Sequence, residues 1–498
     1  MKKLFYTGIA ALMILPGPGM AAENEDENIK TLDEVVVTAT KVEEKRREVP
    51  NSVILHDQYD ITDAPVFSIG ELLANDPGLD FRTQGDSGGA VQTMQIRVMS
   101  ANATQVFVNG VNINSPSLGL AELGRLPLNS IANIEVVKGS GSLLYGTGAM
   151  GGTVSIFTRR PEHEMADLRF EGGFGTNQTY HLGFASGLYF NDYLGYYLAG
   201  NYDETDGFRS NSDLDHKDIS LNLVLDKGDR LDLSLYGQYL DRDFGRPGVK
   251  PPAGTATFYV DDVALYDKES ASLLDRGGDE DALLVLTANS QASDMLDITL
   301  LASINSMENY NYMRYFNSLT STLPGLESWT TNTVYEIEGD VDIVFSPKGD
   351  LLLGAEYINY DWENESIDLD GSGGRLADSR KIIDESLHST GIYGELHYQM
   401  LKPLKILAGL RYEDNSGFGN ETLPRFGLVA TPHDDSVLKI SSGKHFRAPT
   451  PNDLFWPEDP YSKGNPDLLP ETGWHTDVTW EQTLNNDKIF FSASYFHW

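Results

Sequence analysis

The sequence predicts an all-β protein, a transmembrane antiparallel β-barrel preceded by a smaller N-terminal α+β domain. Three observations support this fold class. The second part of the chain alternates apolar and polar residues with the two-residue period of β-strands. Its predicted strands are joined alternately by short turns and by long polar segments, an asymmetry typical of bacterial barrels. A secretory leader precedes a chain without cysteine, so neither disulfides nor thiolate metal sites stabilise it.

Residues 1–22 have the features of a signal peptide. Lys2 and Lys3 precede an apolar core at residues 4–15, and small residues follow at 19–22. That core of about 12 residues is too short to cross a bilayer about 30 Å thick as a helix. No other stretch approaches about 18 consecutive apolar residues, so we expect no transmembrane helix in the mature chain.

The charge balance excludes some partners. The chain has 37 basic and 74 acidic residues, a formal net charge of −37. Such a field repels nucleic acid and anionic membrane surfaces, so we expect no nucleic-acid partner. Most of the excess is accounted for by a solvated acidic surface, although carboxylates are also ligands of divalent cations. The mean hydropathy of −0.31 fits a soluble protein and equally a barrel with a polar lining.

A valine-rich segment lies within the polar stretch 23–48, which we interpret as this segment with its linker. Five of its eight residues are β-branched, so it is stiff and suited to join a partner's sheet edge as an added strand. A buried strand is the alternative interpretation. The segment consists of Asp33, Glu34, Val35, Val36, Val37, Thr38, Ala39 and Thr40.

Residues 49–160 are predicted to form the α+β domain. Ser68, with Glu71 three residues later, has the pattern of a helix N-terminus. Asp76-Pro77-Gly78 ends this helix. Six glycines between positions 139 and 152 permit tight turns and close approach of the backbone to a surrounding wall. Strands are predicted at residues 94–98, 104–108 and 134–137, with a tight turn at 109–110.

Residues 166–498 are predicted to form the barrel. In 335–345, carboxylates occupy every second position, which a water-free sandwich core does not tolerate but a polar lumen does. The stretches 219–225 and 231–240 alternate in the same way. We count about 15 strands, and we expect long loops at 241–280, 306–330, 361–386 and 445–473.

Several motifs resemble TonB-dependent outer-membrane receptors in order and spacing. They are DPGL, VFVNGV and IEVVKGSGSLLYGTGAMGGTVSIFT in the first domain, and FRAPTPNDLFWPEDPYSKGNPDLLPET near the end of the chain. The first domain resembles that family's plug domain, which lies inside the barrel lumen. The valine-rich segment resembles the TonB box, through which TonB and its inner-membrane energising complex drive transport.

The resemblance implies a monomer embedded in outer-membrane lipid of a Gram-negative cell. It also implies about 22 strands in a complete barrel. Bacterial barrels close with an even number of strands, so we expect this chain to be incomplete and to lack roughly seven strands. A natural barrel of about 14 or 16 strands is the alternative.

The resemblance further implies a large ligand bound by the outward loops of the plug. Small polar side chains on two loops are the candidates: Gln84, Asp86, Ser87, Asn112, Asn114, Ser115 and Ser117. The region between Pro449 and Asn465 lacks the histidine of haem receptors. On the plug loops, only Arg82, Arg97 and Arg125 are available to an anionic siderophore. IRVMSANATQVFVNGVNIN resembles cobalamin receptors, so cobalamin or a related metal chelate is expected, with a ferric siderophore as the alternative.

Cobalamin receptors also bind Ca²⁺ through extracellular carboxylates, which implies a Ca²⁺ site here. The candidate ligands are Glu204, Asp206, Asp213, Asp215, Asp241 and Asp243. Solvated acidic loops are the alternative. A surface receptor or adhesin that does not transport is the alternative of a different class. We expect no enzymatic activity, because no Ser/His/Asp order with supporting motifs and no metal-spaced histidine pair occurs.

Overall fold

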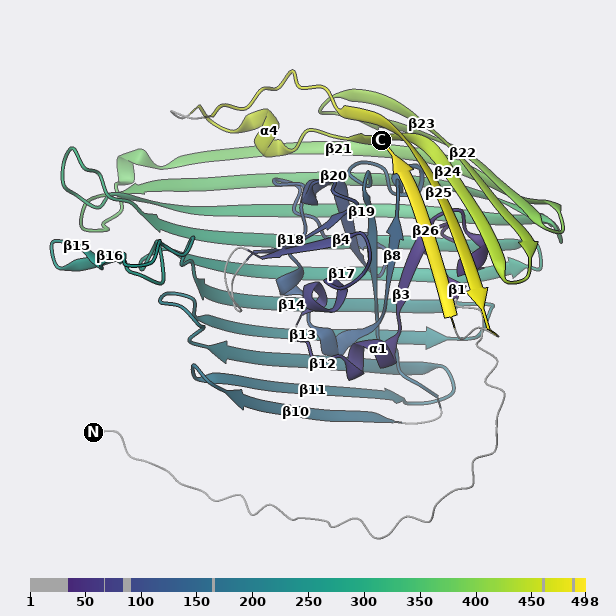
Figure 1. Ribbon diagram of the computed structural model, residues 1–498, viewed down its shortest axis with the longest axis horizontal. Helices are drawn as coiled ribbons and strands as arrows, with labels where there is room; N and C mark the ends of the chain where they lie inside the picture. The colour runs from purple at the N-terminus through teal and green to yellow at the C-terminus, as the bar shows by residue number, and fades with distance from the viewer. Residues whose placement is uncertain (1–34, 67, 84–90, 164–165, 459–461, 486–488) are drawn as a thin grey trace, which may run out of the picture.

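A computed structural model describes residues 35–66, 68–83, 91–163, 166–458, 462–485 and 489–498. The predicted signal peptide, the two acidic residues of the valine-rich segment and three of the predicted ligand contacts lie outside these residues. Those five are Asp33, Glu34, Gln84, Asp86 and Ser87. The structure consists of a large curved sheet and a smaller domain against its concave side (Figure 1).

The large sheet has 15 antiparallel strands that pair in the order of the chain. Its edges are β10 and β26, which do not pair with each other within the described chain. This confirms the predicted barrel architecture and strand number. The strands are β10 (Asp167–Gly175), β11 (Thr179–Tyr189), β12 (Leu194–Thr205), β13 (Leu214–Asp226), β14 (Asp232–Gly245), β17 (Arg276–Ser293), β18 (Leu296–Arg314), β19 (Gly325–Ser346), β20 (Gly349–Leu369), β21 (Lys381–Leu401), β22 (Leu404–Asn415), β23 (Gly419–His433), β24 (Ser436–Arg447), β25 (Glu471–Leu484) and β26 (Ile489–His497).

The two faces of this sheet differ as the alternation predicts. Along β13, Ile219 and Leu221 are exposed on the convex side, whereas Asp218 and Ser220 are buried on the concave side. Apolar residues on the outside and polar residues on the inside are the arrangement that lipid requires of a barrel. Within the described chain, no helix is long and apolar enough to span a membrane.

Several strands are longer than predicted. β18 continues to Arg314 and β20 to Leu369, so parts of the expected loops 306–330 and 361–386 are strand. β19 has 22 residues, which corresponds to about 75 Å at about 3.4 Å per residue. This length exceeds the hydrocarbon thickness of about 30 Å more than twofold, so these strands extend beyond the membrane. A small hairpin, β15 (Phe258–Val260) and β16 (Val263–Tyr266), lies in the connection between β14 and β17.

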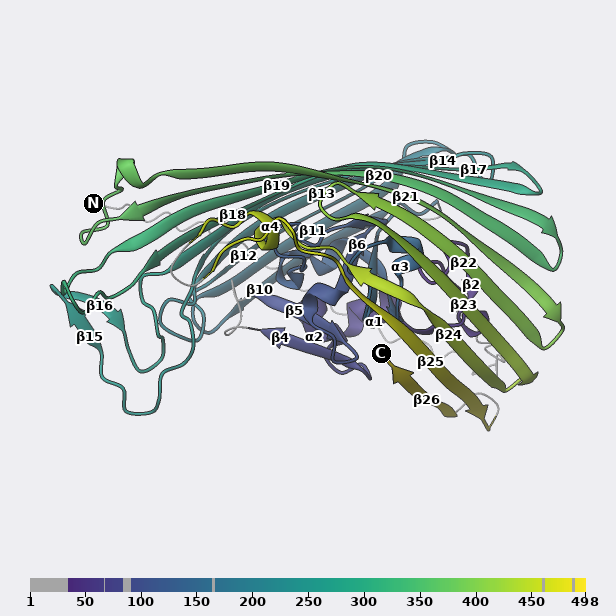
Figure 2. The ribbon, with the colours of Figure 1, turned by 90° about the horizontal axis from the view of Figure 1, so that it is seen from above.

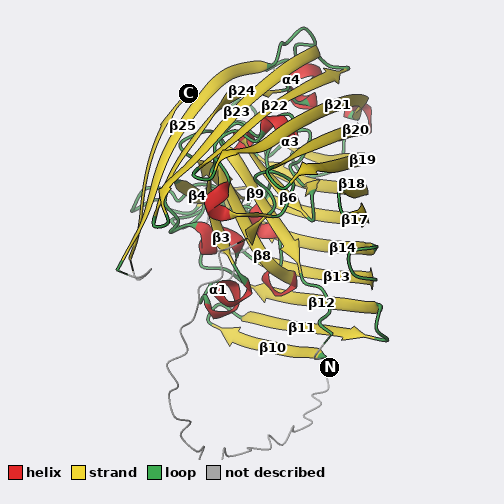
Figure 3. Ribbon diagram, turned by 90° about the vertical axis from the view of Figure 1, so that its right-hand side faces the viewer, coloured by secondary structure: helices red, strands yellow, loops and turns green. Residues whose placement is uncertain are grey.

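The smaller domain, the plug, lies inside the curve of the sheet (Figures 2 and 3). Its central sheet has the order β3-β8-β9-β6-β7, with β6 parallel to β9. Its elements are β3 (Ser52–His56), α1 (Gln58–Asp63), α2 (Ile69–Leu73), β4 (Leu79–Thr83), β5 (Gln92–Ile96), β6 (Thr104–Val108), β7 (Val111–Asn112), η3 (Leu123–Arg125), η4 (Leu128–Ser130), β8 (Ile131–Lys138), α3 (Ser142–Tyr145) and β9 (Gly152–Thr158). The plug core is continuous with the wall, since Val108 and Ile156 belong to the same apolar cluster as Val285 and Leu301.

Of two local predictions for the plug, the helix cap is confirmed and the end of one strand is wrong. The Ser68 hydroxyl accepts a hydrogen bond from the Glu71 N–H at 3.2 Å, as expected of a helix cap. The strand predicted at 94–98 ends earlier, at Ile96, because Arg97 and Val98 have φ of +53° and +68°. These left-handed conformations turn the chain away from the strand.

Candidate ligand-binding cavity and coupling segment

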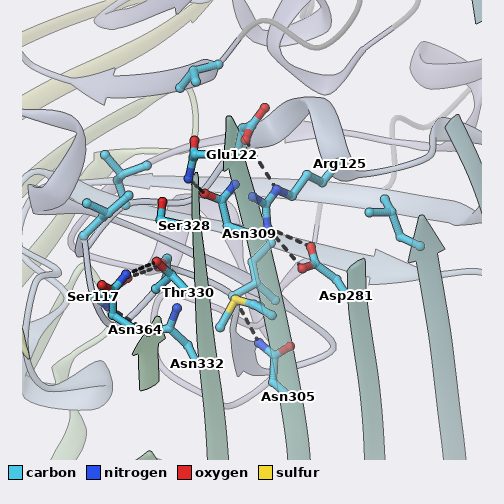
Figure 4. Close-up of a pocket in the computed structure, with 18 of the residues that line it drawn as sticks. Ser117, Glu122, Arg125, Asp281, Asn305, Asn309, Ser328, Thr330, Asn332 and Asn364 are labelled. Carbon is cyan, nitrogen blue, oxygen red and sulfur yellow. Dashed lines mark hydrogen bonds and ion pairs between the residues drawn. The ribbon is translucent and has the colours of Figure 1, made fainter. Parts of the chain in front are cut away.

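A cavity of about 410 Å³ lies between the plug and the inner face of the wall (Figure 4). The plug loop 113–126 forms one side, and β14 and β17–β20 form the other. Six of its lining residues are asparagines, and they alternate with methionine, serine and threonine side chains. These asparagines are Asn305, Asn309, Asn311, Asn332, Asn364 and, from α4 (Pro451–Phe455), Asn452. Such a lining offers both donors and acceptors around an apolar floor.

Two of the predicted plug contacts line this cavity. The Ser115 and Ser117 hydroxyl oxygens lie 3.0 Å apart, and the Ser117 N–H donates to the Asn332 side-chain oxygen at 3.1 Å. This bond joins the plug loop to β19. The loop and the wall therefore share one hydrogen-bonded surface.

The other two predicted contacts in the described chain, Asn112 and Asn114, do not line this cavity. Asn114 is buried, and its amide accepts from the Val106 N–H at 2.9 Å and donates to the Thr104 carbonyl at 2.9 Å. Asn112 accepts from the Asn114 N–H at 2.8 Å. Because these amides are used by nearby backbone, they hold the loop in shape.

The wall residues of the cavity were missed from the sequence. Asn305, Asn309 and Asn311 occupy alternate positions of β18, so they share its inner face. The period-two pattern of asparagines was the available signal. It did not identify the strand that would face the plug.

The charges at the cavity are balanced. Glu122 and Asp281 are its two carboxylates, and Arg125 and Arg246 are its two guanidinium groups. Arg125 donates to Asp281 at 2.9 Å and is 2.6 Å from Asp279. Burial alone would lower the pKa of the Arg125 guanidinium, but Asp281, Asp279 and Glu122 together raise it above its usual value. The cavity therefore has no net formal charge.

The other two plug arginines singled out from the sequence are also paired. Arg97 is buried in an ion pair with Asp477 of β25, and Arg82 is 2.8 Å from Asp80. Neither residue lines the cavity. An anionic ligand in the cavity would therefore have to compete with carboxylates for Arg125, whereas Arg246 donates to the Asn311 amide.

The valine-rich segment is folded into the protein. β1 (Val35–Val36) pairs with β2 (Glu44–Lys45), and Val36, Thr38 and Thr40 are buried. The Thr38 N–H donates to the buried Glu135 carboxylate at 2.9 Å, and the Tyr145 hydroxyl donates to the Thr38 carbonyl at 2.8 Å. The segment is therefore partly buried in this structure, whereas strand addition to a partner requires an accessible edge. A partner strand can pair with this segment only after the segment leaves its site.

Lys41 fastens the end of this segment to the wall. Its ammonium forms an ion pair with Glu338, lies 3.6 Å from Asp340 and donates to the Tyr393 hydroxyl at 2.7 Å. Burial lowers the pKa of Lys41, an effect that Asp340 and Glu356 oppose. The alternating carboxylates of β19, predicted to face a polar lumen, therefore face a cation of the N-terminal segment.

The six carboxylates predicted to bind Ca²⁺ do not converge. No three of them bring oxygen atoms within 4.8 Å of one another, although all six belong to the described chain. Glu204, Asp215 and Asp243 lie opposite one another across β12–β14. Their side chains point away from the lumen, because successive residues of a strand face opposite sides and His216, next to Asp215, is buried on the inner face. Asp241 also lies on the outer side of β14.

Most of these carboxylates have other partners. Arg276 bridges Asp213 and Asp243, and Lys217 lies 2.8 Å from Asp215. Asp206 accepts from the Gln178 amide at 2.5 Å. In this structure these carboxylates therefore form ion pairs and hydrogen bonds, and Ca²⁺ binding by them stays a prediction.

Comparison with known proteins identifies the family. The profile described as "TonB dependent receptor-like, beta-barrel" matches residues 159–497, and that of the "TonB-dependent Receptor Plug Domain" matches residues 45–153. The chain is 26% identical over 483 residues to the "Vitamin B12 transporter BtuB" of Vibrio vulnificus (strain YJ016), covering 94% of this chain and 70% of the relative. It is 27% identical to the protein of the same name from Photobacterium profundum, covering 98% of this chain and 74% of that relative.

A solved structure of the unliganded ferric citrate transporter FecA superposes with a TM-score of 0.72 at 17% identity. The match covers 91% of this chain and 70% of that one, and at this identity it shows the shared fold. The profile matches cover most of the chain, in the order plug and then barrel. The chain therefore belongs to the TonB-dependent receptor family of outer-membrane β-barrel proteins.

Proposed function

We propose that the protein is an active transporter that binds cobalamin or a related metal chelate outside the cell and imports it into the periplasm. The ligand passes through without chemical change, so the proposed activity is transport and not catalysis. The observation that supports this ligand class best is the asparagine-rich cavity between plug and wall, whose charged side chains balance. The name of the relatives in Vibrio and Photobacterium, vitamin B12 transporter, points the same way.

The chemistry of the cavity favours a neutral ligand rich in amide groups. Carboxamide side chains both donate and accept hydrogen bonds, so asparagines on facing strands can match the carboxamides of a corrinoid. A ferric siderophore with several negative charges would need cations without partners. At the cavity, Arg125 is held by Asp281 and Asp279, and Arg246 contacts Asn311.

The folded N-terminal segment provides the route for energy coupling. In the proposed cycle, TonB pairs with Val35–Thr40 once that segment has left Glu135 and the wall, and force on the segment then moves the plug. The β-branched residues favour strand pairing. The proposed partner therefore acts on the side of the plug where Lys41 contacts β19 and β21.

Calorimetric titration of the purified chain with cyanocobalamin and, separately, with a ferric tris-catecholate tests the ligand class. We expect the corrinoid to bind and the catecholate not to bind. Asn332→Ala and Asn364→Ala should each weaken corrinoid binding by about 1 kcal/mol, the typical contribution of one hydrogen bond. Asn420→Ala, an exposed site on β23 outside the cavity, serves as the matched control.

Binding of the catecholate without the corrinoid would favour the siderophore alternative and contradict the proposed ligand. Corrinoid binding of equal strength in the wild type and in both cavity variants would contradict the proposed site. Binding without energised uptake would favour a surface receptor that does not transport.

A further inference from the structure

A histidine and two carboxylates meet where the N-terminal segment touches the short-turn end of the wall. They are Glu44 of β2, Asp350 of β20 and His397 of β21, and one ligand atom from each lies within 4.8 Å of the others. The His397 Nδ1 atom is 2.7 Å from Asp350 Oδ2 and 3.9 Å from Glu44 Oε1. Ligand atoms that share a tetrahedral Zn²⁺ at about 2.1 Å lie about 3.4 Å apart, between these two distances.

A second observation is that buried carboxylate oxygens at the cluster have no donor among the described residues. Asp342 of β19 is only 7% exposed, and its Oδ1 has no hydrogen-bond partner in the described chain. Its carboxyl group lies within hydrogen-bond reach of Asp350, so it points into the cluster. Glu44 Oε2 also has no partner there. A buried carboxylate oxygen without a donor is costly, and a bound cation removes that cost.

The carboxylates around the cluster outnumber the lysine and arginine side chains beside them. Glu44, Asp342, Asp350 and Glu395 are acidic, whereas Lys405 and Arg425 are basic. Exchange of a monovalent cation such as the Lys405 ammonium for a divalent ion at Glu44 would reduce the imbalance.

The second ring nitrogen of His397 contacts a carboxylate, as is usual for metal-binding histidines. This nitrogen, Nε2, lies 3.1 Å from the buried Glu395 Oε1. A carboxylate on the far nitrogen fixes the ring orientation and raises the basicity of the nitrogen that faces the metal. His397 lies directly opposite Asp350 in the sheet, so the two ligands are placed by strand pairing.

We propose that Glu44, Asp350 and His397 bind a divalent transition-metal ion. One imidazole with two carboxylates and an open position for water suits Zn²⁺, whereas Ca²⁺ prefers six to eight oxygen ligands. Lys405, which contacts Glu44, moves away from Glu44 when the ion binds.

The site would connect metal binding to the coupling segment, a consequence that rests on the proposed function. Glu44 pairs with Val36 in the β1–β2 ladder. An ion shared by Glu44 and two wall strands would hold that ladder against the barrel. Bound metal would thus disfavour release of the segment that TonB is proposed to grasp.

Zinc titration of the purified full chain in detergent, after removal of metals with EDTA, tests the site. We expect one Zn²⁺ per chain, and Ca²⁺ should bind at least tenfold more weakly. His397→Gln and Glu44→Gln should each weaken Zn²⁺ binding at least tenfold. His433→Gln, at an exposed histidine on β23, two strands from His397 in the sheet, should leave the affinity unchanged.

Failure of the wild type to bind Zn²⁺, or equal affinity in the wild type and both ligand variants, would overturn the proposal. Glu44→Gln keeps the test valid if His397→Gln does not fold, because Glu44 belongs to the N-terminal segment and not to the wall. Neither measurement requires a transport ligand or TonB, so failure of the metal site is distinguishable from failure of the proposed function.

A spin label tests the regulatory consequence. The chain has no cysteine, so Val35→Cys provides one labelling site at a residue that is 50% exposed. Zn²⁺ should decrease the mobile fraction of the label at this position, and His397→Gln should abolish the decrease. Zinc binding without a change in mobility would overturn the link to the coupling segment.

Discussion

Lys41→Met is expected to release the coupling segment. In the folded site, Glu338 and Asp340 of β19 would lose their cation beside two further buried carboxylates, Glu336 and Glu356. Loss of one partner from a buried ion pair typically costs about 3–5 kcal/mol. After the segment is released, water can reach the carboxylates. The lost ion pair therefore destabilises mainly the state in which the segment lies against the wall. At about 1.4 kcal/mol per tenfold change, the release equilibrium should shift about 10²- to 10⁴-fold.

The assay is electron paramagnetic resonance of a spin label at Val35→Cys, which reports the mobile fraction of the segment. Lys402→Met, at an exposed short turn, removes the same charge without touching the segment and serves as control. Glu338→Gln combined with Lys41→Met should shift the equilibrium less than the sum of the single changes, because the two side chains contact each other. An unchanged mobile fraction in Lys41→Met would show that Lys41 does not hold the segment against the wall.

Three further predictions follow from the plug and its N-terminal segment. Val36→Pro removes a backbone N–H needed for strand addition, so uptake should be lost while surface binding of the ligand persists; uptake at the wild-type rate would contradict the coupling role. Val98→Gly should stabilise the plug by about 1 kcal/mol in urea unfolding, because this 87%-exposed β-branched residue has φ of +68°; a destabilised variant would contradict this. The hydrogen bond to Asp76 raises the pKa of His56, so its stabilisation is complete below the unfolded pKa of about 6.5 and is lost as pH rises through the folded pKa. Hydrogen exchange of β3 and β8 should show this loss, and His56→Gln should abolish the pH dependence; an equal pH dependence in the variant would argue against the pair.

The barrel could be predicted because the alternation of apolar and polar residues can be read within each strand. Alternation such as that of residues 219–225 specifies both the strand and the face that meets lipid, and the structure agrees. Helix capping at Ser68 can be read locally in the same way. The end of β5 was predicted too late because nothing in the residue types of Arg97 and Val98 indicates a left-handed backbone.

The burial of the valine-rich segment could not be predicted from its own residues. Its contacts come from Glu135, 97 residues away from Thr38, and from Arg425, 386 residues away from Ala39. Pairing over such distances depends on how the plug docks in the wall. The same limit applies to the acidic residues of β12–β14, whose composition suits Ca²⁺ but whose strand register turns several of them to the outer surface.

Two of the four predicted ligand contacts in the described chain line the cavity. Ser115 and Ser117 lie on a loop that the family resemblance placed near the ligand, and both line the cavity. Asn112 and Asn114 share that composition but are used by nearby backbone, a distinction that requires the three-dimensional loop. The wall asparagines contribute only because β18 happens to face the plug.

Energised uptake of labelled cyanocobalamin tests most directly whether the protein is an active corrinoid transporter. The chain would be expressed in a Gram-negative host without a corrinoid receptor of its own, in matched strains with and without TonB. We expect periplasmic accumulation only in the strain with TonB, and loss of that accumulation in Val36→Pro. Equal accumulation in both strains, or surface-bound corrinoid that never enters the periplasm, would contradict this expectation.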